Sequence, residues 1–170
     1  MKIRTLVIAV LALSGSAFAA SPGSPKTTTF TVSSDVVANC TISATNLDFG
    51  SYDPLVANKT APQDVNTSVK VLCTKGSTSV TVGLDTGLHA AGGSRFMADA
   101  VSGDTLQYEL YSDSAGGTVW GNSGTGLVTW STFGPISGGA VAKTVYGRVP
   151  AGQDKAVGHY TDVVTATVNF

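Results

Sequence analysis

Apolar and polar residues alternate along the end of the chain. In GHYTDVVTATVNF, from Gly158 to Phe170, one side of a period-two pattern is apolar and the other is mainly polar. The apolar side holds Tyr160, Val164, Ala166, Val168 and Phe170. This pattern predicts one half-buried final strand. Because no later segment covers its far edge, we expect that edge to be hidden by closure or by pairing with another segment.

A second alternating segment lies near the start of the chain. Phe30, Val32, Ser34 and Val36 share one parity, and Thr31, Ser33 and Asp35 share the other. Further strands are predicted at 41–49, 65–73, 80–84, 106–111 and 141–149, with a short strand ending at Trp120. Gly-rich breaks separate the later strands, and no amphipathic helix is evident. The predicted fold class is therefore an all-β sandwich.

The first residues have the pattern of a secretory signal. Lys2 and Arg4 precede an apolar run, and Ala17-Phe18-Ala19 has the small-x-small pattern of a cleavage site. The run is too short to span a bilayer. We therefore predict that residues 1–19 are removed and that the mature chain is exported.

Charge and composition narrow the function classes. Removal of Lys2 and Arg4 leaves eight basic against eleven acidic residues, a net charge of −3, and no basic stripe. Because binding to nucleic acid needs clustered Lys and Arg, we predict that the protein does not bind nucleic acid. Only Glu109 among the acids is Glu, whereas Gly, Thr, Ser and Val are abundant. This composition is typical of strands and turns.

The chain has two cysteines, Cys40 and Cys73. In an exported chain a lone pair is most simply a disulfide. The alternative is a metal pair, which needs further ligands nearby, and His89 and His159 are distant in sequence. The disulfide is favoured, and the parity of Cys73 with Val69 and Val71 predicts that its sulfur points inward.

No pattern of catalytic residues is found. His159 has the outward parity of the final strand, where a solvated histidine is expected rather than a general base. Asp85, Asp99 and Asp104 lack the spacing of a calcium loop, and Asp is common in turns. We therefore predict no catalytic site, no metal site and no cofactor.

Five blocks, in order along the chain, resemble a known family. They are LDFGSYDP from Leu47, YELYSD from Tyr108, WG at Trp120, YGRVPAGQ from Tyr146, and the ending, GHYTD from Gly158 with TVNF from Thr167. Together they are similar to the spore coat protein U domain family, which includes subunits of archaic, Csu-type chaperone-usher pili. The likeness extends over the whole mature chain.

The resemblance implies an incomplete immunoglobulin-like sandwich that lacks its last strand. It also implies an N-terminal extension and a disulfide between the first two strands. Residues 20–37 are then a donor-strand extension and residues 38–170 the sandwich domain. By the same resemblance, a neighbouring subunit's extension fills the missing strand. The parities above then assign the donor residues Phe30, Val32, Ser34 and Val36 and the acceptor-groove residues Tyr160, Val164, Ala166, Val168 and Phe170.

Several alternatives stay open. The first alternating segment could instead be an ordinary strand paired within its own domain. The favoured function is a structural subunit of a surface fibre serving adhesion and biofilm formation, exported through the periplasm to the cell surface. Its expected partners are neighbouring subunits, a periplasmic chaperone and an outer-membrane usher. The other candidates are a spore or cyst coat protein and a secreted carbohydrate-binding sandwich. A sugar binder would expose aromatics on one face, and the scattered Trp120, Trp130, Tyr111 and Tyr146 favour core roles instead.

Overall fold

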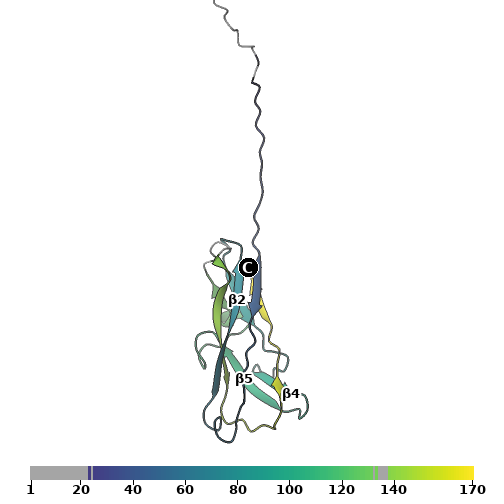
Figure 1. Cartoon of the computed structure of the whole chain (residues 1–170), viewed down its shortest axis with the longest axis vertical. Coiled ribbons are helices and arrows are strands. Elements are labelled where there is room, and N and C mark those ends of the chain that lie inside the picture. The colour runs from purple at the N-terminus through teal and green to yellow at the C-terminus, as the bar shows by residue number, and fades with distance from the viewer. Residues whose placement is uncertain (1–22, 24, 132, 134–137) are drawn as a thin grey trace, which may run out of the picture. The chain divides into compact units, whose positions relative to one another are not determined.

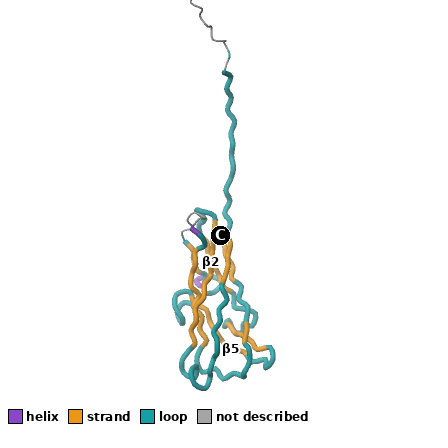
Figure 2. The backbone as a smooth tube through the Cα atoms, in the orientation of Figure 1, coloured by secondary structure: helices purple, strands orange, loops and turns teal. Residues whose placement is uncertain are grey.

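A computed structural model describes residues 23, 25–131, 133 and 138–170. Contacts divide the chain into two units, Met1–Asp35 and Val36–Phe170. The signal sequence predicted at 1–19 lies outside the described residues. In the first unit, residues 25–35 carry no strand and are drawn as loop in Figure 2. Their large apolar side chains are open to solvent: Phe30 is 85% exposed and Val32 82%.

The second unit consists of two antiparallel sheets (Figure 1). The six-stranded sheet has the order β1 (Cys40–Ala44), β2 (Gln63–Cys73), β7 (Val141–Val149), β5 (Thr105–Tyr111), β4 (Arg95–Asp99) and β8 (Tyr160–Thr161). The three-stranded sheet has the order β6 (Val128–Trp130), β3 (Val80–Leu84) and β9 (Ala166–Asn169). The described residues contain no α-helix, and the 3-10 turn η1 covers Gly124–Gly126. The all-β prediction is confirmed.

The core lies between the two sheets and is built from alternate residues of the strands. Its buried members include Val69, Val71, Val80, Val82, Leu106, Tyr108, Leu110, Val145 and Val149. Alternation places them inward because successive side chains of a strand point to opposite faces. Strand β5 is the clearest case, since Leu106, Tyr108 and Leu110 are buried and the residues between them are not.

Both tryptophans are core residues. Trp120 is 0% and Trp130 2% exposed, and their ring centroids lie 5.8 Å apart. Each indole N–H donates to a backbone carbonyl, of Val82 at 2.9 Å and of Val141 at 3.1 Å respectively. A buried indole with a satisfied N–H is a packing residue. These rings are therefore not available as the exposed face that a sugar binder needs.

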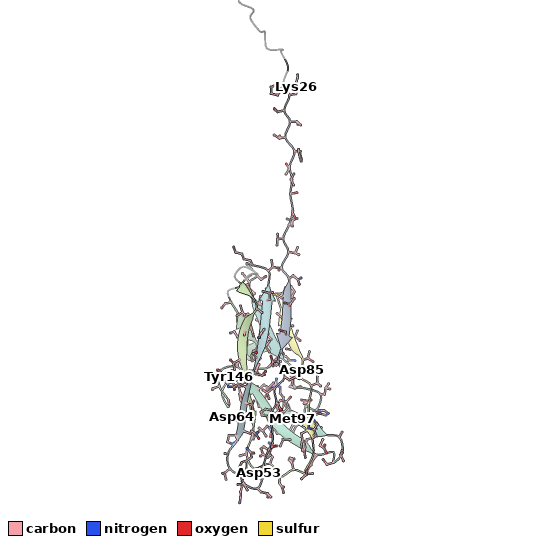
Figure 3. All side chains as sticks on the ribbon, viewed as in Figure 1. Lys26, Asp53, Asp64, Asp85, Met97 and Tyr146 are labelled. Carbon is pink, nitrogen blue, oxygen red and sulfur yellow. A yellow bond between two sulfur atoms is a disulfide. The ribbon has the colours of Figure 1, made fainter. Side chains whose placement is uncertain are left out.

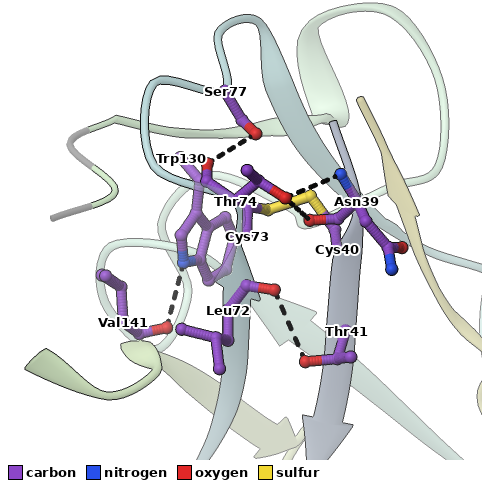
Figure 4. Close-up of a disulfide and its surroundings, with 9 residues drawn as sticks. All are labelled: Asn39, Cys40, Thr41, Leu72, Cys73, Thr74, Ser77, Trp130 and Val141. Carbon is purple, nitrogen blue, oxygen red and sulfur yellow. Dashed lines mark hydrogen bonds between the residues drawn. A yellow bond between two sulfur atoms is a disulfide. The ribbon is translucent and has the colours of Figure 1, made fainter. Parts of the chain in front are cut away.

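The disulfide predicted from the two cysteines is present. Cys40 and Cys73 face each other in the β1–β2 register, with a sulfur–sulfur distance of 2.00 Å (Figure 4). Cys73 is 2% exposed, as its parity predicted. Next to it, the backbone N–H of Asn39 donates to Thr74 Oγ1 at 3.1 Å. The start of β1 is thus tied to the end of β2 by covalent and polar contacts together.

The prediction of one continuous final strand is wrong. The chain forms β8 at the edge of the six-stranded sheet and β9 at the edge of the three-stranded sheet, and residues 162–165 cross between them. The in-and-out alternation persists as far as Val168, but Phe170 is 56% exposed. The alternation of apolar and polar residues indicates which way side chains face, but it does not indicate that the chain passes from one sheet to the other. The crossing is set by polar contacts of Asp162 and Thr165, described below.

Other strand boundaries also differ from the predictions. Strand β1 ends at Ala44, well before Phe49, and Trp120 is preceded only by an isolated bridge between Val119 and Tyr111. Strands β4 and β6 were not predicted. Strand β4 begins with the buried Arg95, whose charge conceals the strand pattern from a reading of apolar residues.

No helix within the described ranges has the length and apolar character needed to cross a membrane.

Candidate interaction groove

Two adjoining pockets form one open groove in the second unit. Their volumes are about 620 and 470 Å³. Both are lined by Leu47, Asp48, Phe49, Met97, His159 and Tyr160. Because these residues are shared, the pockets are two compartments of a single groove. Met97 on β4, labelled in Figure 3, belongs to both.

The floor of the groove is the inner face of the six-stranded sheet. In the larger compartment it consists of Val69, Val145, Leu110, Tyr108 and Met97; Leu106 and Val149 continue it in the smaller one. Most of these residues belong to the hydrophobic core cluster. The groove therefore opens directly onto the core of the sandwich.

Edge strands lie close to the groove. Among the described residues, β1 is paired only with β2, and β9 only with β3. Ala44 at the end of β1 and Ala166 at the start of β9 both line the larger compartment. An edge strand presents backbone N–H and C=O groups on its outer side. The groove thus combines apolar pockets with strand edges, which is the combination that an added strand needs.

One wall of the groove is the irregular segment after β1. Leu47 and Phe49 rest on Gly147 of β7, where an added Cβ would lie 2.8 Å from Leu47 Cδ1 and 2.9 Å from Phe49 Cζ. The Phe49 ring also meets the edge of Tyr108, with centroids 6.2 Å apart. Glycine at 147 therefore allows the two side chains to approach the sheet closely.

The opposite wall is the crossing at residues 162–165, held by Asp162. Its carboxylate accepts a hydrogen bond from Tyr108 Oη at 2.7 Å and another from the backbone N–H of Leu88 at 2.9 Å. His89 Nδ1 lies 3.0 Å from the same carboxylate. Burial, and then the bond to Asp162, raises the pKa of the Tyr108 phenol well above its usual value. The phenol therefore stays protonated and serves as a donor.

The far end of the crossing is held by Asp85, which follows β3. The backbone N–H of Thr165 donates to Asp85 Oδ1 at 2.8 Å, and the N–H of Asp85 donates to the Thr165 carbonyl at 3.0 Å. Burial opposes ionisation of Asp85, but the backbone donors of Thr165 and Gly87 outweigh it and lower the pKa of the carboxyl. Two aspartates thus fix both ends of the crossing.

Polar side chains close the end of the domain beyond the smaller compartment. Tyr52 Oη donates to the Pro150 carbonyl at 2.9 Å and accepts from the N–H of Gln153 at 3.0 Å. The side-chain amide of Gln153 pairs with both backbone groups of Gln107, at 2.8 and 3.0 Å. The blocks that begin at Leu47 and at Tyr146 in the sequence therefore meet in space.

The residues proposed from sequence as an acceptor site divide into two groups. Tyr160 lines both compartments, and Val164 and Ala166 line the larger one. Val168 is partly buried against the core, and Phe170 is exposed. Sequence reasoning missed the opposite wall and most of the floor, including Leu47, Phe49, Met97 and Tyr108. Leu47, Phe49 and Tyr108 lie in predicted strands and family-like blocks, whereas Met97 had neither signal.

The residues proposed as a donor strand are all exposed. Phe30, Val32 and Val36 are 85%, 82% and 85% exposed, and Ser34 is exposed as well.

In the part of the chain that the structure describes, no three His, Cys, Asp or Glu side chains come together in a way that could hold a metal ion. His159 is exposed, and its backbone N–H donates to Asp99 at 3.1 Å.

Comparison with known proteins agrees with the resemblance seen in the sequence. The spore coat protein U domain matches residues 26–167. Protein U of Myxococcus xanthus is 38% identical over 183 residues, covering 99% of this chain and 98% of that protein.

A solved structure has a related fold. It is a chain of the pre-assembly complex between the chaperone CsuC and the tip adhesion subunit CsuE, from archaic chaperone-usher Csu pili of Acinetobacter baumannii. The identity is 25% and the TM-score 0.54, over 79% of this chain and 40% of that chain. This chain therefore spans less than half the length of that relative. By the match over most of its length and the likeness to Protein U, the chain belongs to the spore coat protein U domain family.

Proposed function

We propose that this chain is the structural subunit of an exported surface fibre that polymerises by donor-strand complementation. The observation that carries the proposal is the open groove, in which core side chains and strand edges are accessible together. A groove of this kind leaves apolar surface and backbone groups without partners inside the domain. In this proposal the sandwich is immunoglobulin-like and lacks its last strand.

The occupant proposed is the extension of a neighbouring copy, residues 20–37. Phe30, Val32 and Val36 alternate with polar residues and are exposed in the structure, so they supply apolar side chains at the two-residue spacing of a strand. Ser34 has the same parity and would occupy a shallower or more polar position. Burial of one large apolar side chain contributes about 1.5–3 kcal/mol, so several together make a stable junction.

Export and partners follow from the same proposal. The disulfide indicates an extracytoplasmic location, because disulfides persist in oxidising compartments. The structural relative comes from a chaperone-usher pilus and was solved with its chaperone. A periplasmic chaperone that covers the groove before assembly, and an outer-membrane usher, are the corresponding partners here. Adhesion and biofilm formation are the roles that such a surface fibre would serve.

A coat protein is the second candidate. It is favoured by the likeness to Protein U, which extends over nearly the full length of both chains. A coat on a resting cell could use the same strand exchange, so the groove alone does not distinguish a fibre subunit from a coat protein. The carbohydrate-binding alternative is disfavoured because both tryptophans are buried.

Deletion of residues 20–37 tests the proposal in cells that make the protein with its native neighbouring genes. The deleted chain should be exported but should form no fibres in electron micrographs of the cell surface. Replacement of Val101, an exposed apolar residue outside both the extension and the groove lining, by Ser is the matched control and should leave fibres intact. Fibres of normal length from the deleted chain would exclude donation by this segment. Gold labelling of a continuous layer on resting cells, without fibres, would favour the coat.

A further inference from the structure

The crossing at residues 162–165 forms a wall of the groove that stands without support from an occupant. Asp162, Val163 and Val164 all line the larger compartment. Val164 faces inward and is partly buried, whereas Val163 is 61% exposed. Apolar surfaces on two sides of an empty groove favour collapse, because collapse removes them from water. An open groove therefore needs a restraint within the domain itself.

Asp162 supplies such a restraint because its carboxylate joins the two sheets. Tyr108, which donates at 2.7 Å, lies in β5 of the six-stranded sheet. Leu88 and His89, whose nitrogens lie at 2.9 and 3.0 Å, belong to the loop that follows β3 of the three-stranded sheet. The Asp162 side chain is only 2% exposed, and hydrogen bonds to an ionised acceptor are stronger than neutral ones.

The loop after β3 is shaped around this carboxylate. Gly87 has a φ of +80°, which favours glycine, and a Cβ added there would lie 1.9 Å from Asp162 Oδ2. Asp85, two residues earlier, holds Thr165 at the other end of the crossing. The local sequence thus accommodates the buried carboxylate at the position where the chain changes sheet.

We propose that Asp162 is a positioning residue that keeps the groove wall open before a donor strand arrives. This inference rests on the proposed function. A preformed groove accepts a strand without first reorganising, so the fraction of subunits competent to bind is high. Loss of the Asp162 contacts lowers that fraction and slows association. Dissociation changes little, because in the filled groove the strand itself supports the wall.

The test uses the full mature chain with its own extension disabled. Phe30→Asp, Val32→Asp and Val36→Asp together define an acceptor form that cannot donate, since each change would bury a charge without a partner. Stopped-flow fluorescence then measures association and dissociation of a labelled peptide of residues 27–38. Asp162→Asn removes the charge at constant size, and Tyr108→Phe removes one donor.

Asp113→Asn is the matched control. The Asp113 carboxylate also accepts three hydrogen bonds, from the N–H of Ser114 and from the N–H and hydroxyl of Thr118. It lies in the loop after β5, outside the set of residues that line the groove. A general loss of stability from removing a well-bonded carboxylate would affect this variant as well.

We expect Asp162→Asn to slow association about tenfold and Tyr108→Phe to slow it about threefold. The dissociation rate of both variants should change less than about twofold, and Asp113→Asn should change neither rate. Association of Asp162→Asn within twofold of the parent, or equal slowing in Asp113→Asn, would overturn the proposal. If Asp162→Asn does not fold, Tyr108→Phe decides by the same comparison. Failure of the parent acceptor form to bind the peptide would instead refute strand donation, and this role with it.

Discussion

At the scale of residues, one buried arginine shows how single side chains join the sheets. Arg95 is 2% exposed, and its guanidinium donates to the carbonyls of Asp85 at 2.7 and 2.9 Å, Leu84 at 3.0 Å and Trp120 at 2.8 Å. It also bonds to the Glu109 carboxylate. A buried charge is tolerated only when it is paired and hydrogen-bonded. Arg95 thus connects β4 and β5 to the end of β3, beside the groove.

The disulfide gives the first prediction at this scale. Replacement of Cys40 and Cys73 by Ala should lower the free energy of unfolding by roughly 3–4 kcal/mol, because the unfolded chain is no longer constrained by the loop. Urea titration of the mature chain measures this difference. Thiol labelling of the unreduced, denatured wild type is the control and should find no free thiol. Two labelled thiols would contradict the bond.

The second prediction concerns acid. The hydrogen bond from Arg148 lowers the pKa of Asp64 below its ordinary value of 3.8, and the pKa of Asp85 is lowered as well. A carboxyl whose pKa is lower in the folded than in the unfolded state stabilises the fold at pH values above its unfolded-state pKa. This stabilisation is lost as the pH falls through its folded-state pKa. The free energy of unfolding should therefore decline below about pH 4. Urea titrations at pH 7, 4 and 2.5 measure the free energy of unfolding. The Asp64→Asn variant should show a smaller decline with acid than the wild type. An equal decline in that variant would contradict the assignment to Asp64.

At the scale of elements, period-two patterns predicted the strands that lie inside the sheets. The predictions at 65–73, 80–84, 106–111 and 141–149 correspond to β2, β3, β5 and β7. Strands β5 and β7 have one face on the core, so burial and sequence alternate together along them. Strand β4 was not predicted because its first residue is a buried arginine. The split of the final strand was not predicted because it depends on side-chain contacts to Asp85 and Tyr108.

The groove was only partly predictable for a similar reason. Alternation identified Tyr160, Val164 and Ala166, which lie on one side of it. The other wall, at Leu47 and Phe49, was predicted as the end of a strand at 41–49, but β1 ends at Ala44 and the segment after it is positioned by contact with Gly147. The alternation of residues did not reveal that the chain leaves the strand at Ala44 or that it contacts β7.

A third prediction belongs to the donor element. Phe30→Ala should weaken each junction between subunits by roughly 3 kcal/mol if the ring is fully buried, on the scale of large-to-small core substitutions. Fibres of this variant should dissociate at lower denaturant concentration than wild-type fibres, as followed by gel filtration. Thr31→Ala, on the opposite parity, is the matched control and should change little. Equal effects of both changes would show that parity does not determine burial in this segment.

At the scale of the whole molecule, the proposed subunit has one strand to donate and one groove to be filled. Such an interface is heterologous, and repetition of it builds an open-ended fibre. In the proposed assembly the extension of each copy enters the groove of its neighbour, so every added subunit offers a new acceptor site. Growth is then limited only by the supply of subunits and by whatever covers the groove before assembly.

The central claim is that the empty groove takes the strand formed by residues 27–38. Fusion of these residues after Phe170 through a flexible linker should fill the groove within one chain, raise the unfolding temperature and yield monomers by light scattering. The same fusion with Phe30, Val32 and Val36 changed to Asp in the appended copy should do neither, because it would bury unpaired charges. If the two fusions behave alike, or if the unmodified mature chain is already a stable monomer, the domain is a self-contained sandwich and strand donation is wrong.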